Sequence, residues 1–209
     1  MLSFLRIGII FSFLFSVVSL SILVLKTFSF GKKPLYAEPK GSNIKGILYA
    51  FGLGMMPWEK ESARKHLPTY IAGIVYHAGV FGALFYLFSL IFSFGLAKGF
   101  VFFLRLLFII GILNGLALLF KRIFLPTIKK ISCPDDFAAN IIVDIFLVCA
   151  LIHTYFMSAA PLFFLVAIMM FLYIPVGKIR HCFFFFYIRI LYGIFYGRRN
   201  ILPPKTYKV

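Results

Sequence analysis

The chain has 209 residues, of which 62% are hydrophobic and only 13% are charged, and its mean hydropathy is +1.00. A soluble domain has a charged fraction of about a quarter, so this composition excludes an ordinary soluble protein and predicts an all-α integral membrane protein. A formal net charge of +16 would suggest a nucleic-acid partner in a soluble protein. Here the charge borders apolar segments, which indicates membrane topology, and we expect no nucleic acid.

Five apolar segments are long enough, at about 20 residues, to cross a bilayer as helices, the state that satisfies every backbone group internally. The predicted spans are about 2–25, 68–96, 99–120, 137–156 and 161–181. Together with an interfacial helix over 182–197 they form one membrane domain, 1–197, which a cytoplasmic tail over 198–209 follows. The first apolar run lacks a small-residue cleavage site, so we expect a retained span rather than a removed signal.

The basic residues are distributed unevenly between the two sides of the predicted bundle. Eight lie between the first two spans, four follow the third, and seven lie from Lys178 to Lys208. The segments that face the other way hold only Arg6 and Lys98. The positive-inside rule therefore predicts a five-helix bundle with its N-terminus outside and its C-terminus in the cytoplasm, where basic residues meet anionic lipid headgroups.

The loop over 26–66 is the only long one, and within it the apolar stretch 46–58 is too short to cross a bilayer. We expect a surface helix or a re-entrant turn that ends at Trp58, the sole tryptophan. This basic, partly apolar loop is either a docking platform for a soluble subunit or a linker that lies along the membrane.

Two histidines stand near the start of the second span. His77 lies inside it, where neutral imidazole is tolerated and is the usual axial ligand of haem iron. Gly73 lies one turn earlier on the same face, and its missing side chain would let a flat macrocycle approach the backbone. His66 is a candidate for a second-haem or quinone site, but its position beside basic residues and before Pro68 favours the headgroup region.

Other polar residues lie in the last two spans. His153, near the outer end of the fourth span, is either structural or part of a quinone or second-haem site. Asp144 in the same span either pairs with a basic residue or takes a proton from a quinol. His181 follows Lys178 and Arg180 at the inner end of the last span, and these basic side chains either extend to the interface or pair with haem propionates.

The three cysteines form neither a CxxC motif nor a set of four, so the chain by itself cannot hold an iron-sulfur cluster. Two stretches carry a further signal: YHAGVFG, residues 76–82, and YIPVGKIRHCFFFFYIR, residues 173–189. They resemble the ligand motifs of the haem b membrane subunits typified by the gamma subunit of respiratory nitrate reductase. That family includes membrane cytochromes of sulfite-reductase-associated, heterodisulfide reductase and high-molecular-weight cytochrome complexes. The resemblance covers five spans and implies that His77 and His181 are the axial ligands of one haem b.

The family carries further histidines where this chain has Leu87 and Phe163, so the resemblance implies that the second haem and the usual outer quinol site are absent. With the one haem b in place, we expect Gly73 to make room for it and Arg180 and Lys178 to pair with its propionates. The implied function is electron transfer between membrane quinone and a cytoplasmic iron-sulfur subunit. The chain would be a non-catalytic or quinone-reactive subunit of an oxidoreductase complex with other membrane subunits, in the cytoplasmic (inner) membrane of a prokaryote.

The alternative function is a haem-free membrane anchor or a small transporter subunit. A transporter is expected to show internal repeats or broken helices about a midplane site, and the sequence shows neither. A membrane acyltransferase ranks last, because no histidine and carboxylate pair stands at a helix boundary.

Overall fold

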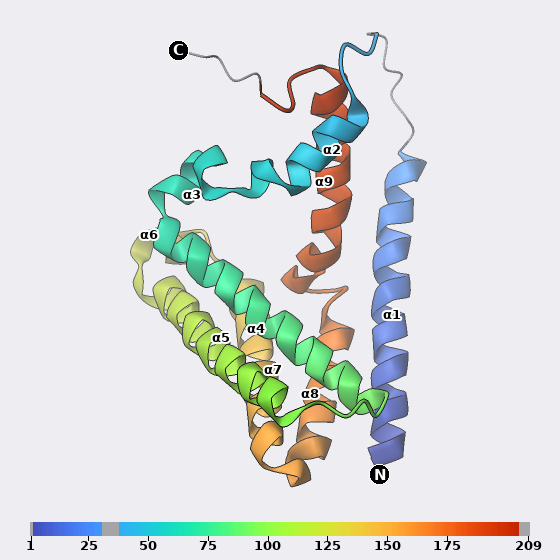
Figure 1. Ribbon diagram of the computed structural model, residues 1–209, viewed down its shortest axis with the longest axis vertical. Helices are drawn as coiled ribbons and strands as arrows, with labels where there is room; N and C mark the ends of the chain where they lie inside the picture. The colour runs from blue at the N-terminus through green and yellow to red at the C-terminus, as the bar shows by residue number, and fades with distance from the viewer. Residues whose placement is uncertain (1, 31–37, 205–209) are drawn as a thin grey trace. The chain divides into compact units, whose positions relative to one another are not determined.

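The computed structural model describes residues 2–30 and 38–204 (Figure 1). Lys32, Lys33 and the end of the predicted tail, 205–209, lie outside the described residues. Within the described part of the chain there are helices and turns but no strand. Among the described residues, five helices are long and apolar enough to cross a membrane, which is the number predicted: Leu2–Ser29, Leu67–Ile91, Lys98–Phe124, Pro134–Tyr155 and Lys178–Arg198. The chain divides into two compact units, each of which is described by itself.

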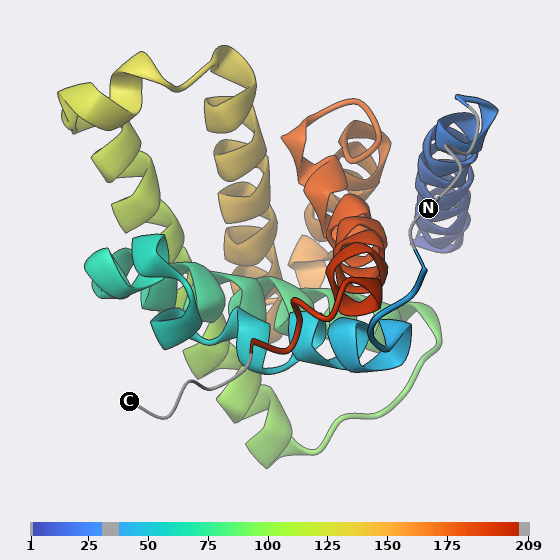
Figure 2. The same cartoon turned by 90° about the horizontal axis from the view of Figure 1, so that it is seen from above.

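Unit 1 consists of Met1–Val18 and Pro68–Ile179. Its elements are the first part of α1 (Leu2–Ser29), then α4 (Leu67–Ile91), α5 (Lys98–Phe124), α6 (Pro126–Lys130), α7 (Pro134–Tyr155), η3 (Met157–Ala159) and α8 (Ala160–Tyr173). The helices α7 and α8 pack against each other in opposite directions, joined by the short turn η3 (Figure 1, Figure 2). Glycines let α4 and α5 approach closely, since a Cβ added at Gly79 would lie 3.1 Å from Gly111 Cα.

The core of unit 1 is apolar and aromatic. It includes Ile9, Ala83, Tyr86, Leu104, Phe108, Phe146, Leu147 and Phe171. Leu87 and Phe163, the positions at which the resembled family has histidines, are both fully buried in this core. The Phe163 ring lies 5.4 Å from that of Phe146 and 6.2 Å from that of Tyr86, measured between centroids. Both positions are therefore filled by tight apolar packing.

The last span differs from the sequence prediction. A single helix was expected over 161–181, but α8 has only 14 residues and ends at Tyr173. The fifth long apolar helix is instead the segment predicted to lie at the interface, α9 (His181–Arg198) with the turn before it. The reason is local: Ile174 is still helical, but Pro175 after it has no backbone N–H to continue the helical hydrogen bonds, and its ring crowds the preceding turn. The chain then turns, with Gly177 N donating to Tyr173 O at 2.9 Å.

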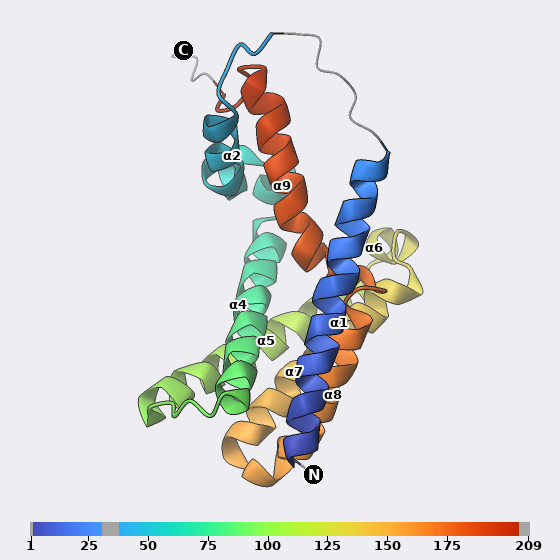
Figure 3. The same cartoon turned by 90° about the vertical axis from the view of Figure 1, so that its right-hand side faces the viewer.

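Unit 2 consists of Ser19–Leu67 and Arg180–Val209. Besides the end of α1 it holds α2 (Asn43–Phe51), η1 (Leu53–Met55), η2 (Pro57–Glu59), α3 (Glu61–Lys65) and α9. With nine residues, α2 is too short to cross a bilayer, and it overlaps the first part of the short segment expected over 46–58. It packs against α9 (Figure 3), where Gly46 lies against the backbone of Gly193 and Gly197. Trp58 at the end of this segment is 62% exposed.

Candidate functional site

His77 lies on an exposed face of α4 in unit 1. Its Nδ1 is 2.6 Å from Gly73 O, and because a carbonyl oxygen can only accept, Nδ1 carries the proton and Nε2 carries the lone pair. A Cβ added at Gly73 would meet no atom within 4 Å. Phe81, one turn later, is 61% exposed, and its ring centroid lies 6.4 Å from that of His77. The structure therefore brings His77 and Gly73 together, as predicted from helical spacing, and places Phe81 beside them.

His181 and Arg180 belong to unit 2, where both are exposed at the start of α9. Lys178 belongs to unit 1, and its Nζ donates to Asp136 Oδ2 at 2.7 Å. The guanidinium of Arg122 lies 3.2 Å from the other oxygen of the same carboxylate. Lys178 therefore has a protein partner in this structure, a carboxylate that the sequence did not single out.

His66 is exposed in the turn between α3 and α4. His153 is only 1% exposed, and its Nδ1 lies 2.8 Å from the hydroxyl oxygen of Tyr86. The rings of Tyr86 and Phe163 lie within 6 Å of the imidazole, at 5.6 and 5.8 Å between centroids. An imidazole enclosed in this way presents almost no surface to a quinone, which favours the structural alternative for His153.

Asp144 is 6% exposed and lies where α4, α5 and α7 meet. The hydroxyl of Tyr76 donates to its Oδ1 at 2.7 Å, and Asn140 Nδ2 donates to its Oδ2 at 2.9 Å. None of the ion pairs among the described residues involves Asp144. The side chains that bind its carboxylate are therefore the neutral donors Tyr76 and Asn140, and not the basic residue considered from the sequence. Asn140 was visible in the sequence at a spacing of four residues, whereas Tyr76 lies 68 residues away and only the fold identifies it.

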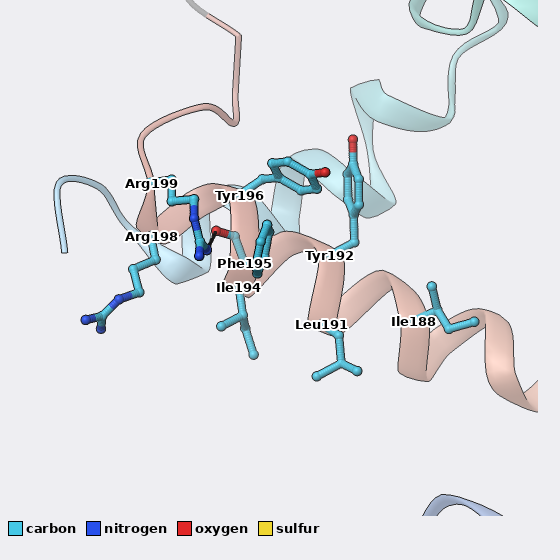
Figure 4. Close-up of a pocket in the computed structure, with 8 residues that line it drawn as sticks. All are labelled: Ile188, Leu191, Tyr192, Ile194, Phe195, Tyr196, Arg198 and Arg199. Carbon is cyan, nitrogen blue, oxygen red and sulfur yellow. Dashed lines mark hydrogen bonds between the residues drawn. The ribbon is translucent and has the colours of Figure 1, made fainter. Parts of the chain in front are cut away.

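A pocket of 480 Å³ runs along α9 in unit 2 (Figure 4). Its lining residues are Ile188, Leu191, Tyr192, Ile194, Phe195, Tyr196, Arg198 and Arg199. The Arg199 guanidinium lies 3.5 Å from the centroid of the Phe195 ring and donates to the Phe195 carbonyl oxygen at 2.8 Å. The lining contains no histidine, cysteine or carboxylate, so this pocket offers apolar surface, guanidinium groups and the side chains of two tyrosines.

Within the described residues, no three His, Cys, Asp or Glu side chains gather as a metal site. An axial pair on a macrocycle requires two ligands only, so this finding leaves a haem as a candidate. Comparison of the chain with protein-family models, with curated proteins and with solved structures found no match. A function is therefore proposed from the polar residues of α4, α7 and α9.

Proposed function

We propose that the chain is a b-type cytochrome subunit of a membrane redox complex, which passes electrons between membrane quinone and a cytoplasmic iron-sulfur subunit. The observation that carries the proposal is the exposed face of α4, where His77 donates its Nδ1 proton to Gly73 O at 2.6 Å. The complex would lie in the cytoplasmic membrane of a prokaryote, with the N-terminus of this chain outside. The basic residues Lys121 and Arg122 at the end of α5 support that orientation.

Two features of the α4 face suit an axial haem ligand. Metal-ligating histidines commonly donate their second ring N–H to a carbonyl or carboxylate, which fixes the tautomer and the orientation of the ring. Here that bond is made to Gly73, so Nε2 is the nitrogen with a lone pair for iron. The absence of any atom within 4 Å of a Cβ at Gly73 provides room for a flat group against the helix backbone. A haem at this face would accept and release one electron at a time.

The second axial ligand proposed is His181, the first residue of α9. Its pairing with His77 rests on the sequence motif, as do the haem propionates proposed for Arg180 and Lys178. Because Lys178 donates to Asp136 at 2.7 Å, it would have to share or exchange that partner to bind a propionate. Arg180 is therefore the stronger candidate of the two. The quinone and the iron-sulfur partner are inferred from the same resemblance.

The test is a reduced-minus-oxidised optical spectrum of the purified chain, with pyridine haemochrome quantification of haem per polypeptide. We expect one haem b per chain in the wild type and no haem in His77→Ala or His181→Ala, both of which should still insert into the membrane. His66→Ala is the matched control and should retain the haem, because it changes an exposed histidine outside the proposed pair. Haem that is lost in His77→Ala but retained in His181→Ala would assign the second ligand elsewhere.

A wild-type chain without haem, produced in cells with ample haem supply, would overturn the proposal. The chain would then be assigned to the haem-free class, as a membrane anchor or a small transporter subunit. Two haems per chain would instead return His66 to consideration as a ligand.

A further inference from the structure

A stripe of polar side chains runs along one face of α7 in unit 1. Asp136, Asn140 and Asp144 are spaced by four residues, which places them above one another on the helix. The stripe covers about 12 Å at 1.5 Å per residue. It ends at Asp144, because the residues of the next turn on this face are Leu147 and Val148.

The stripe begins at Asp136, which is partly exposed and charged. The side chain of Asp136 is 12% exposed and pairs with Lys178, which is 48% exposed, and with Arg122. Nearby at the same end of the unit, Lys121 Nζ donates to the Thr69 hydroxyl oxygen. The Asp136 end of the stripe therefore lies at the basic end of unit 1, where we expect water and lipid headgroups.

At the other end of the stripe lies Asp144, a buried carboxyl whose two hydrogen-bond donors are both neutral. Asp144 Oδ1 accepts from Tyr76 at 2.7 Å, and Oδ2 accepts from Asn140 at 2.9 Å. An ionised carboxylate in a membrane interior is strongly disfavoured unless a cation compensates it, and binding a proton removes that charge. The ion pairs of the described residues provide no such cation at Asp144.

Both protonation states of this carboxyl can be satisfied by the groups around it. Asn140 has an amide donor and a carbonyl acceptor, so it can donate to the carboxylate or, turned over, accept from the carboxylic acid. In its present orientation Nδ2 also lies 3.3 Å from Tyr76 Oη and 3.4 Å from Gly115 O, so the amide is shared among several acceptors rather than held by the carboxylate alone. Gly115 leaves the space for this cluster, since a Cβ there would overlap Asp144 Oδ1 and lie 2.6 Å from the Tyr76 ring.

We propose that Asp144 is a proton-binding site within the membrane domain, loaded and unloaded from the basic end of unit 1 along the Asp136 and Asn140 face of α7. A proton from the basic end adds to a lone pair of a carboxylate oxygen and forms an O–H bond, Asn140 turns so that its carbonyl oxygen accepts from it, and nothing is oxidised or reduced. Tyr76 is the titratable group that faces the carboxyl from α4, and Gly115 is the neighbour from α5. Because the stripe ends in apolar residues, the site takes up and returns a proton on one side and does not conduct it across.

The site does not depend on a bound haem and is tested separately from it. Infrared spectra of the purified chain in lipid are recorded over a pH titration, with Glu38→Gln as a control that changes only an exposed carboxyl. We expect a carboxylic acid band that appears as the pH falls, that is lost in Asp144→Asn, and that Glu38→Gln leaves in place. In Tyr76→Phe the band should remain but change frequency, since a hydrogen bond to the carboxyl has been removed.

The route is tested by transfer of the protein into D₂O. We expect the Asp144 band to exchange readily in the wild type and to exchange more slowly in Asn140→Leu, which interrupts the stripe with an apolar side chain. If Asp144→Asn removes no band at any pH at which the protein stays folded, the proton site is refuted. If Asn140→Leu exchanges as fast as the wild type, the proposed route along α7 is refuted.

Discussion

Substitution of Gly46 by alanine is the sharpest test of how unit 2 is built. Gly46 lies on α2 where that helix packs against α9, and a Cβ added there would overlap the carbonyl oxygen of Gly193. It would also lie 2.6 Å from Gly197 Cα and 3.0 Å from Gly197 N. All three contacts are with backbone atoms, which cannot rotate away as a side chain can. The two helices must therefore separate if Gly46→Ala is to be accommodated.

The size of the effect follows from two opposing contributions. Extra methyl groups in a packed interior destabilise by about 1–3 kcal/mol. Because the three contacts are all with the backbone of α9, this change is placed near ~3 kcal/mol. Alanine is favoured over glycine within a helix by about 1 kcal/mol, which offsets part of that loss. The net destabilisation of the contact between α2 and α9 is then ~2 kcal/mol, or roughly a 30-fold rise in local opening, since 1.4 kcal/mol corresponds to a factor of ten.

Amide hydrogen exchange, measured by mass spectrometry on the protein in lipid nanodiscs, reports this opening directly. Peptides from α2 and from the facing half of α9 should exchange about 30-fold faster in Gly46→Ala. Gly99→Ala is the matched control, because Gly99 is also helical but a Cβ there meets nothing within 4 Å. Exchange at wild-type rates in Gly46→Ala, or equal acceleration in both variants, would show that the glycine contact does not hold α2 against α9.

Two further predictions concern single hydrogen bonds. Tyr86→Phe removes the hydroxyl that lies 2.8 Å from His153 Nδ1, and the buried imidazole loses that partner. We therefore expect the free energy of unfolding in detergent to fall by about 1–3 kcal/mol. An unchanged unfolding midpoint would contradict this, and Tyr155→Phe, at a residue 57% exposed, provides the control. Burial and a hydrogen bond to Glu59 raise the pKa of Tyr49 from its ordinary 10.0 to about 12. Its stabilising contribution is therefore complete below pH 10 and is lost as the pH rises towards 12. In an ultraviolet titration, Tyr49→Phe should lose one phenol from the late phase near pH 12, and a loss from the early phase would refute the assignment.

Hydropathy and length predict most of the helices, because a span must be long, apolar and internally hydrogen-bonded. They do not fix where a span ends when the flanking residues are also apolar. The second span was expected to reach residue 96, but α4 ends at Ile91, and Ser93 adopts a positive φ of 57°. The break after Tyr173 had a visible signal in Pro175 and Gly177, which the apolar residues on both sides obscured.

In the candidate sites, contacts within one helix could be predicted from the sequence, whereas contacts between helices could not. The bond between His77 and Gly73 joins residues four apart on one helix, so spacing alone predicts that they meet. The partners of the buried polar groups are distant in sequence: Tyr76 is 68 residues from Asp144, and Tyr86 is 67 residues from His153. Neither tyrosine stands out in a sequence with 11 of them, and only the packing of α4 against α7 identifies their role.

Consecutive residues of α4 serve the two proposed sites. Successive side chains on an α-helix are about 100° apart, so Tyr76 and His77 point to different surroundings. Tyr76 is directed into unit 1, where it donates to Asp144, whereas His77 is exposed beside Gly73. The proton site therefore depends on the inward face of α4 and the iron ligand on its exposed face. Because each site uses its own side chains, loss of haem from His77→Ala and loss of the carboxyl band from Asp144→Asn are independent results, and either proposal can fail without the other.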